Sequence, residues 1–563
     1  MELIKNASSP EFWQKVQKSD AYRMHRERLA ELWKADCQEP IDALTYSDFR
    51  RFFVDGNRSV YEARYFRRRR AMNTSALLSL IYPEKEEYLV RLMDEIYAIC
   101  DEYTWCLPAH QETLEVNDNA NLDIFACETG FTLAEICTIL GKRLEPLICN
   151  RIRAEIDRRI INSFDQKIWH WERQNENWNA VCTTSVACAV MLMRPELMGK
   201  YKARFDAAAE CYLAGFKEDG ICEEGVGYWN YGFGFFTVYA DMIRTFTNGE
   251  TDYFVRPHVK KIATFMQKCN LSGETVISFS DGSRRESSFL ALLHYLKNEY
   301  PDEIRLLDRS CTHFDDNCGR WCLHLRSFTW FLEEDAQSAG ESEDAVYFAE
   351  NAQWFIRKTA RYGFATKGGT NKEPHNHNDI GTFILAKDGR QVISDIGSGV
   401  YTRQYFKKET RYDHFHCSSR GHNLPMIGEA LQQFGEEYRA KNFLYENGAL
   451  SMDIAGAYGL DSLKSLVREF SFTEQTVTMT DTFDYSGEGV LTERLIMLEK
   501  PVLVSQGSIV VDGVTLNYDP ALCDVSFGEE IDRECRVSKD PIVYTVDLTL
   551  KKGVDRFVLT MTV

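Results

Sequence analysis

Residues 374–402 have the sequence PHNHNDIGTFILAKDGRQVISDIGSGVYT, which predicts both a type of fold and the place of a site. TFILA and RQVIS are strand-forming runs separated by KDG at 387–389, and an Asp-Gly pair is typical of a tight hairpin turn. We therefore predict an antiparallel β-hairpin. Residues that can transfer protons or bind metal ions flank it, namely HNHND at 375–379 and Asp395.

The same period-two alternation continues to the end of the chain. A second Asp-Gly pair, in VDG at 511–513, stands where another hairpin turn is expected. These patterns predict an antiparallel β-sandwich, which we assign to residues 346–563. Polar residues alternate with β-branched or aromatic residues in five segments, at 358–369, 382–397, 464–487, 507–519 and 541–563.

The first part of the chain has a helical pattern instead. Apolar residues recur at i, i+3, i+4 and i+7 at 86–105, 121–144 and 179–193. The pattern predicts stacked helical hairpins over residues 1–340, and both a closed toroid and an open solenoid are compatible with it. Two domains also suit a length of 563 residues. The polar stretch at 333–345 is the predicted linker.

Composition excludes several classes of protein. A formal charge of −19 argues against nucleic-acid binding and against an anionic membrane surface, although a local basic cleft could still bind an anionic substrate. No run of eighteen apolar residues predicts a membrane-spanning helix. The first twenty residues lack the apolar core of a secretion signal, and the 17 cysteines form no CxxC pair. We expect reduced thiols and a cytoplasmic protein; a signal trimmed from the start would instead mean a periplasmic or secreted one. The RRRR run at 67–70 is expected to be a solvated helix face.

Histidines gather at the start of the predicted sandwich. In an extended segment, His375 and His377 point to the same face, so one could bind a metal while the other acts as a base. A tetrahedral zinc site needs imidazole and carboxylate ligands from separate segments, which His377, Asp395 and His422 can supply. His414 and His416 form a rival pair, on a polar stretch that could equally be a solvated loop.

The motifs in this region resemble those of the heparinase II/III-like polysaccharide lyases. The chain has the family's His-x-His-x-Asp-x-Gly element at 375–381, its Asp-x-Gly-x-Gly-x-Tyr element at 395–401, and its His-Asn pair at 422–423. The resemblance implies an α+β multidomain protein in which an (α/α) toroid precedes an antiparallel β-sandwich. It also implies that His375 transfers protons and that His377, Asp395 and His422 hold a structural divalent metal, zinc by preference.

Lyases of this kind break uronate chains by β-elimination, which defines the other groups required. The uronate carboxylate must be neutralised, a base must remove the C5 proton, and an acid must protonate O4. Asn177, in RQNENWNAVC at 173–182, best matches the family's asparagine, and Trp178 stands where some relatives have histidine. The alternative for these asparagines is helix capping. We predict that Asn177 contacts the carboxylate and that Trp178 and Asn179 contact the substrate.

A tyrosine is expected to complete the set. In DGICEEGVGYWNYGFGFF at 219–236, Glu224, Gly225 and Tyr228 reproduce the family's acidic residue, glycine and tyrosine. We predict Tyr228 as the acid and a possible base, with Tyr231 as the alternative, while Glu224 orients a neighbour or contacts a sugar hydroxyl. Packing in an aromatic core is the other interpretation of both tyrosines.

The predicted substrate is an acidic polysaccharide or oligosaccharide. Arg403 and Arg411 could bind carboxylate or sulfate groups, and Tyr412 could line the same cleft. The resemblance favours glycosaminoglycans of the heparan sulfate, chondroitin or hyaluronan type. Three alternatives stay open: an oligoalginate lyase of the same fold, a carbohydrate-binding protein without activity, and a toroid-type glycoside hydrolase. The hydrolase would use carboxylates from Glu223, Glu224 and Asp379.

Overall fold

A computed structural model describes residues 2–37, 40–114, 120–284, 289–306, 316–333, 344–535 and 541–563. The chain folds into two compact units. Unit 1 comprises Met1–Gly215, Asn230–Lys260 and Ser287–Ala339; unit 2 comprises Phe216–Trp229, Lys261–Glu286 and Gly340–Val563. Two segments of the helical half of the sequence therefore belong to unit 2. Residues 334–343 of the predicted linker lie outside the described residues.

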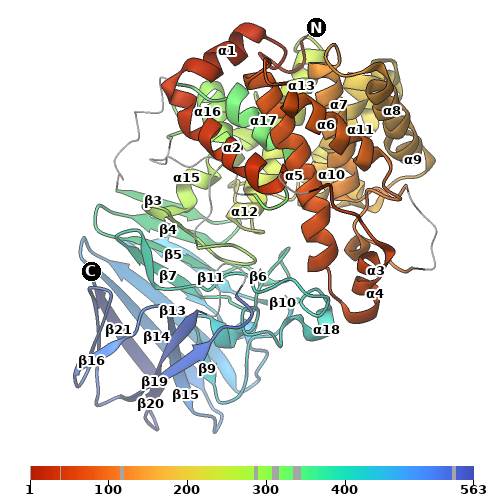
Figure 1. Cartoon of the computed structure of the whole chain (residues 1–563). Coiled ribbons are helices and arrows are strands. Elements are labelled where there is room, and N and C mark those ends of the chain that lie inside the picture. Colours follow the sequence, from red (N-terminus) through yellow and green to blue (C-terminus); the bar gives the residue numbers. More distant parts are fainter. Residues whose placement is uncertain are drawn as a thin grey trace. The chain divides into compact units, whose positions relative to one another are not determined.

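Unit 1 is helical, as predicted (Figure 1). The three segments with the clearest helical period form α6, α7 and α10. The helices of this unit are α1 (Pro10–Lys18), α2 (Arg23–Cys37), α3 (Tyr46–Phe49), α4 (Arg51–Asp55), α5 (Ser59–Ile81), α6 (Glu86–Cys100), α7 (Ile124–Leu140), α8 (Pro146–Ile156), α9 (Asn162–Gln166), α10 (Asn177–Met193), α11 (Met198–Leu213), α13 (Gly234–Phe246), α16 (Leu290–Glu299) and α17 (Trp321–Thr329), while α14 (Pro257–Ala263) crosses the boundary with unit 2.

The helices of unit 1 close into a ring. Helix α10 packs against α7, α11 and α13, and α17, the last helix of the unit, packs against α5 and α7 near its start. The Asn73 side chain donates a hydrogen bond to the carbonyl of Gly319, and the Trp13 and Phe328 rings lie 5.6 Å apart. This contact between the first and last helices favours the toroid over the open solenoid.

The arginine run at 67–70 is not a solvated face, so that prediction was wrong. Each arginine in it is paired with an acidic side chain of the same unit. Arg69 is buried and donates to both carboxylate oxygens of Glu102 at 2.7 Å. A local charge count cannot detect this, because the partners lie 25 to 34 positions away in the sequence.

Unit 2 is built mainly from antiparallel strands, as predicted for the second half (Figure 1). It also contains α12 (Val226–Tyr228), α15 (Phe265–Cys269) and α18 (Lys408–Arg411). The strands are β1 (Asn270–Ser272), β2 (Thr275–Val276), β3 (Ala345–Ala349), β4 (Trp354–Lys358), β5 (Gly363–Lys367), β6 (Thr370–Asn371), β7 (Phe383–Lys387), β8 (Arg390–Ile393), β9 (Pro425–Ile427), β10 (Gly435–Arg439), β11 (Lys441–Glu446), β12 (Ala449–Asp453), β13 (Leu463–Phe472), β14 (Thr476–Tyr485), β15 (Leu491–Met497), β16 (Val502–Ser505), β17 (Ser508–Val511), β18 (Val514–Tyr518), β19 (Cys523–Ile531), β20 (Ile542–Leu550) and β21 (Arg556–Thr562).

Three of the sheets form the sandwich. Their strand orders are β11-β12-β13-β14-β21-β18-β17-β16, β19-β20-β15-β9 and β3-β4-β5-β7-β8. Phe364 and Phe383 of the five-stranded sheet pack against Phe470 of the eight-stranded sheet, with ring centroids 4.9 and 5.3 Å apart. The amide of Ser394, after β8, donates to the carbonyl of Ile496 in β15 at 2.8 Å. The eight-stranded sheet thus forms one layer, and the joined five- and four-stranded sheets supply the other side of one core.

Both predicted hairpin turns are present. Asp388 and Gly389 connect β7 to β8, and Asp512 and Gly513 connect β17 to β18. All four residues have positive φ, between 43° and 76°, as a type I′ turn requires of its two central residues. The first of these hairpins carries the site, because the 375–379 segment leads into β7 and Asp395 follows β8.

All cysteines in the described ranges are free thiols, and most are buried. In the same ranges, no single helix is long and apolar enough to cross a membrane; the bent pair Asn177–Met193 and Pro195–Leu213 meets the length and composition test only when the two are taken together.

Candidate functional site

Tyr228 and His375 form a stacked pair in unit 2. Their ring centroids lie 4.2 Å apart, with 23° between the ring planes. The hydroxyl oxygens of Tyr228 and Tyr401 are 2.8 Å apart, within hydrogen-bond distance. Tyr228 ends α12, His375 precedes β7 and Tyr401 follows β8. The fold of this unit therefore brings together two residues that the sequence predicted to transfer protons.

The backbone at this pair adopts conformations that restrict which residues fit. Gly225, the residue before α12, has φ of +104°, and a Cβ there would lie 3.3 Å from the carbonyl oxygen of Phe279. Glycine is required because a side chain would be both strained and crowded. His375 itself has φ of +56°, which is uncommon for a residue with a side chain. Its ring orientation is therefore determined by specific contacts.

Glu224 lies near Nε2 of the His375 imidazole. Its Oε2 lies 3.7 Å from His375 Nε2, which is too long for a hydrogen bond but close enough for a strong charge interaction. The Glu224 side chain is buried, and that of His375 is 19% exposed. The predicted role of Glu224 in orienting a neighbour therefore has a geometric basis, with His375 as the neighbour.

Asp281 is the residue at this site that the sequence did not single out. Its side chain is fully buried, and four donors surround its carboxylate. His375 Nδ1 lies 2.9 Å from Oδ2, while His377 Nε2 (3.0 Å), Tyr405 Oη (2.5 Å) and Arg411 (3.0 Å) all contact Oδ1. Nothing periodic marks Asp281 in the sequence, because it stands in a short polar loop about a hundred positions before its partners.

The carboxylate and the two histidines influence one another's protonation. Burial opposes ionisation of Asp281, but hydrogen bonds from His375 and His377 and the charge of Arg411 hold its pKa well below the usual range. Burial disfavours the charged form of His375, yet the hydrogen bond and charge of Asp281, with the charge of Glu224, raise its pKa. For His377 burial prevails and lowers the pKa to about 4, so this ring is neutral near pH 7.

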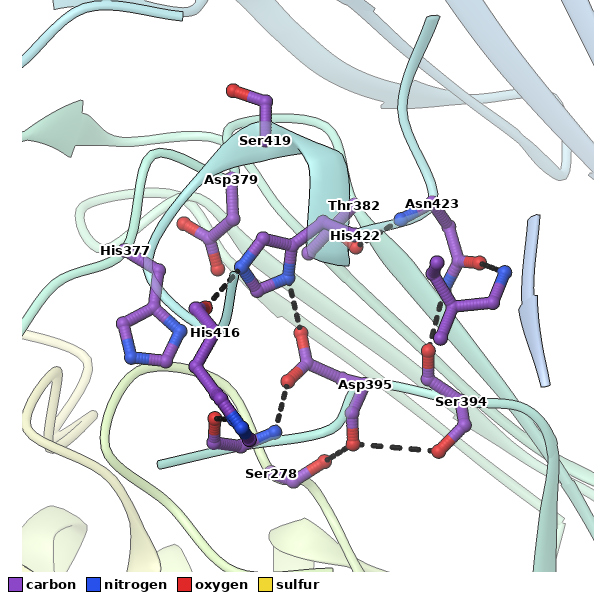
Figure 2. Close-up of polar contacts among 12 residues, drawn as sticks. Ser278, His377, Asp379, Thr382, Ser394, Asp395, His416, Ser419, His422 and Asn423 are labelled. Carbon is purple, nitrogen blue, oxygen red and sulfur yellow. Dashed lines mark hydrogen bonds and ion pairs between the residues drawn. The ribbon is translucent and has the colours of Figure 1, made fainter. Parts of the chain in front are cut away.

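The predicted metal ligands lie close together (Figure 2). His422 Nδ1 is 3.0 Å from Asp395 Oδ2, and its Nε2 is 2.9 Å from the carbonyl oxygen of His416. Ligand atoms of Asp379, Asp395 and His422 all lie within 4.8 Å of one another, and the His377 ring is 5.3 Å from that of His422. Figure 2 shows the side chains of His377, Asp379 and Asp395 gathered around the His422 ring.

These residues fit a divalent metal ion. Buried imidazole and carboxylate groups in such proximity are the donors that zinc prefers. Within the described part of the chain, His377 Nδ1 and Asp379 Oδ2 are buried without a hydrogen-bond partner, which is costly unless another group contacts them. Lys367 Nζ lies 2.6 Å from Asp379 Oδ1, so a buried ammonium group already neutralises this carboxylate. Asp395 and His422 thus share a candidate ligand group with Asp379, whereas the ligand atom of His377 groups with those of Asp281 and Cys417, so a site made of His377, Asp395 and His422 stays a prediction.

The rival pair of histidines has other partners. His416 is fully buried, so a solvated loop is the wrong description for it. Its Nδ1 contacts the carbonyl oxygen of Gly397 at 2.9 Å and its Nε2 contacts Asp532 at 3.0 Å. His414 Nδ1 lies 2.9 Å from Glu534. Both histidines thus connect this loop to the segment after β19.

The predicted substrate-binding residues of unit 2 differ in exposure. Arg411 is buried and directs its guanidinium inward, to Asp281 and to the backbone carbonyls of His375 and Asn376. The sequence suggested that Arg411 binds a carboxylate or sulfate group of the substrate; in the structure its guanidinium binds groups of the protein instead. Tyr412 donates to the Asn376 side chain at 2.8 Å, while Arg403 is exposed.

In unit 1, the predicted asparagines have distinct surroundings. Asn177 is the first residue of α10 and is buried, and a Cβ on Gly232 would lie 3.2 Å from its own Cβ. Asn179 is fully buried and donates to the carbonyls of Gln174 and Ala208, at 2.7 and 2.9 Å. Asn179 therefore connects α10 to the segment before it and to α11, and it is not a capping residue, because the N-cap position is Glu176 and carries no side-chain cap. Trp178 is partly exposed.

Tyr231, the alternative to Tyr228, belongs to unit 1. Its hydroxyl donates to Glu128, and the Arg320 guanidinium lies 4.0 Å from its ring centroid. Burial, followed by the charge of Glu128, raises the pKa of Tyr231 well above its usual value. Its hydroxyl is thus committed to an internal carboxylate, whereas the hydroxyl of Tyr228 contacts another hydroxyl.

The surroundings of Glu223 predict that the stability of unit 2 depends on pH. Burial, and then the charge and hydrogen bond of Glu373, raise its pKa from 4.5 to about 9, while Lys217, 3.5 Å away, partly offsets this. Between these two values the folded protein binds more protons than the unfolded chain, so stability falls as pH rises. Glu223→Gln should therefore leave Tm unchanged near pH 5 and raise it by roughly a few degrees near pH 8.5 in differential scanning calorimetry. The exposed Glu218→Gln is the control; an equal gain in both variants would contradict this assignment.

The metal site predicts a second measurable effect. After chelator treatment, adding zinc should raise Tm, because an ion that binds only the folded state stabilises it. Asp395→Asn should abolish the shift. Asp532→Asn, which changes the neighbouring contact to His416, should preserve it. An equal shift in all three proteins would mean that zinc binds elsewhere.

Comparisons with known proteins give the fold. No protein-family model matches the chain, and no curated protein matches its sequence. Solved structures do match over nearly the whole chain. A heparinase III is 13% identical with a TM-score of 0.65, covering 100% of this chain and 92% of that chain. The heparan sulfate lyase HepC from Pedobacter heparinus is 11% identical with a TM-score of 0.59, covering 99% and 91%.

A lyase named for a different polymer has a similar structure. The Streptomyces coelicolor A3 chondroitin AC lyase, solved with chondroitin sulphate, is 9% identical with a TM-score of 0.56, covering 98% of this chain and 82% of that chain. At these identities the likeness establishes the fold. The predicted order of a helical toroid followed by an antiparallel β-sandwich is confirmed.

Proposed function

We propose that the chain is a polysaccharide lyase that cleaves uronic-acid-containing glycans by β-elimination. The observation that carries the proposal is the stacked pair of Tyr228 and His375, with Tyr228 hydrogen-bonded to Tyr401 and His375 to Asp281. Two adjacent groups that can each give or take a proton are what this reaction requires. The fold shared with lyases named for heparan sulfate and chondroitin supports the same conclusion.

The reaction assigns a task to each group. One base removes the C5 proton of the uronate, the electrons form the C4–C5 double bond, and O4 leaves with a proton from an acid. His375 Nε2 is suited to accept the C5 proton, because Nδ1 is engaged by Asp281. The Tyr228 hydroxyl is suited to donate to O4 and can be reprotonated through Tyr401. Glu224 favours the positive charge that His375 then carries.

Charge develops on the uronate carboxylate, which needs a hydrogen-bond donor. We assign this role to Asn177 of the helical unit. It packs against Gly232, four residues after Tyr228 in the sequence. Asn177→Ala should lower kcat/KM for a uronate substrate by about 10² to 10³, the cost typical of one lost oxyanion donor. Asn175→Ala, an exposed neighbour, is the control, and equal rates in both variants would remove Asn177 from the mechanism.

The metal is assigned a structural role. His377, Asp395 and His422 would hold a divalent ion, zinc by preference, which would supply a rigid connection among the loops that follow β6, β8 and α18. Proton abstraction from carbon needs no metal-bound hydroxide, so the ion's role is to order the loop that carries His375.

Glycosaminoglycans are the favoured substrates, and oligoalginates are the alternative within the same chemistry. The experiment is a panel of heparan sulfate, chondroitin, hyaluronan and alginate polymers and oligomers, with the formation of the unsaturated uronate followed by ultraviolet absorbance, with and without a chelator. Binding without new absorbance would identify a carbohydrate-binding protein. New reducing ends without absorbance would identify a hydrolase, although Asp379, one of its candidate carboxylates, is buried against Lys367.

A further inference from the structure

We propose that Asp281 is a positioning residue that holds His375 in the tautomer with the proton on Nδ1, so that the lone pair is on Nε2, the nitrogen that lies 3.7 Å from Glu224 Oε2. The catalytic consequence of this inference rests on the proposed function, whereas the tautomer itself can be measured without it. The sequence did not indicate Asp281, and the inference comes from its four contacts.

The two carboxylate oxygens of Asp281 are used differently. Oδ1 accepts from three donors, His377 Nε2, Tyr405 Oη and Arg411. In the described residues, the hydrogen bond at Oδ2 is the one from His375 Nδ1, at 2.9 Å. The three donors on Oδ1, one of them an arginine, favour the ionised carboxylate, which can only accept. The proton of this contact therefore resides on His375 Nδ1, and the lone pair of the neutral ring is on Nε2, 3.7 Å from Glu224 Oε2.

The loop that carries Asp281 is fastened to both sides of the site. Ser280 Oγ donates to the carbonyl of Glu223 at 3.0 Å, next to Glu224. On the other side, Ser278 Oγ donates to the carbonyl of Asp395 at 2.8 Å, and the carbonyl of Gly282 accepts from the amide of Ser398 at 3.1 Å. The loop of Asp281 thus connects three segments: the one that carries Tyr228, the one that carries His375, and the one that follows β8.

This arrangement also explains how His375 can hold an uncommon backbone conformation. His375 lies in a turn, with φ of +56°. Asp281 contacts the ring from one side, and Arg411, itself bound to Asp281, donates to the His375 carbonyl at 3.1 Å. One buried carboxylate therefore fixes both the ring and the backbone of this residue. A positioning role predicts an effect on kcat with little effect on KM.

The decisive variant is Asp281→Asn. Its amide oxygen can still accept from Tyr405 and Arg411, but its NH₂ group then faces His375 Nδ1. Two donors cannot pair, so the ring should change to the tautomer with the proton on Nε2. We expect ¹⁵N spectra of histidine-labelled protein at about pH 9, where imidazoles are neutral, to show a protonated Nδ1 for His375 in the parent protein and a protonated Nε2 in the variant. The His375 signals are identified by their loss in His375→Ala.

A kinetic experiment compares kcat and KM of Asp281→Asn with those of Tyr405→Phe. The second variant removes one donor from Oδ1 and leaves the His375 contact in place. We expect kcat on the best uronate substrate to fall by about 10² to 10⁴ in Asp281→Asn with KM nearly unchanged, and by less than about tenfold in Tyr405→Phe. Equal losses in both would mean that Asp281 acts only by stabilising the fold.

The ¹⁵N spectra test the role of Asp281 independently of the proposed lyase activity. If His375 in the parent protein carries its proton on Nε2, the inference on Asp281 is overturned, whether or not the chain is a lyase and whether or not the variant folds. If Nδ1 is protonated but no uronate polymer is cleaved, the proposed function fails and the tautomer assignment stands. An Asp281→Asn protein that retains both the tautomer and full kcat would also overturn the inference.

Discussion

Tyr228→Phe should lower kcat for β-elimination by about two to four orders of magnitude, the range typical of losing one proton-transfer group. Phenylalanine retains the ring that stacks on His375 at 4.2 Å and removes only the hydroxyl that bonds to Tyr401. Packing should therefore survive, and Tm should change little. The rate is measured as the appearance of the unsaturated uronate in single-turnover and steady-state assays.

Two further variants distinguish the roles at this pair. His375→Ala should cause a loss of the same order, roughly 10² to 10⁴ in kcat, because it removes the other proton-transfer group. Tyr401→Phe removes only the hydrogen-bond partner of Tyr228, and we expect a loss closer to tenfold. Near-normal rates in both Tyr228→Phe and His375→Ala would eliminate the proposed site. A loss in Tyr401→Phe as large as that in Tyr228→Phe would transfer the acid role to Tyr401.

Arg468→Met should destabilise unit 2 by about 3 to 5 kcal/mol, the usual cost of removing one partner from a buried ion pair. Arg468, in β13, is fully buried. Its guanidinium contacts Asp481 at 2.5 to 3.1 Å and Glu493 at 3.0 Å. Removing the arginine leaves two acidic side chains in the sandwich core without a cation. The loss is measured by urea unfolding followed by near-ultraviolet circular dichroism.

The same arginine connects the core to the site. It donates at 2.8 Å to the carbonyls of Gly381 and Asn423, which follow the segments of Asp379 and His422. Arg468→Met should consequently weaken the zinc-dependent rise in Tm as well as the fold. The control combines Arg468→Met with Asp481→Asn, which should recover part of the stability because one uncompensated charge is gone. No recovery would mean that the contacts to the two carbonyls, and not the ion pair, carry the effect.

Features with a local cause could be predicted from the sequence. The helical period at 86–105 and the alternation at 464–487 identified helices and strands, because burial of one face imposes a regular spacing on neighbouring residues. The Asp-Gly turns at 388–389 and 512–513 were predictable because few other residues adopt positive φ twice in succession.

The polar contacts of the interior could not be predicted, because no pattern in the sequence marks them. Arg411 looked like a ligand for an anionic substrate, and the structure directs it to Asp281, 130 positions earlier. The arginine run at 67–70 looked solvated and is paired with distant acids. Asn177, Trp178 and Asn179 are consecutive in the sequence, and only the structure shows that both asparagines are buried while Trp178 is partly exposed.

The sequence by itself determined the order of the two architectures, the hairpin at 382–397 and the residue types that can transfer protons or bind metal, since each depends on neighbours within a few positions. Only the tertiary structure decided that Tyr228 stacks on His375, that Asp281 and Lys367 serve the histidine loop, and that Arg468 supports it. Side chains that meet across sheets and loops can be separated by any number of residues, so their partnership leaves no periodic mark in the sequence.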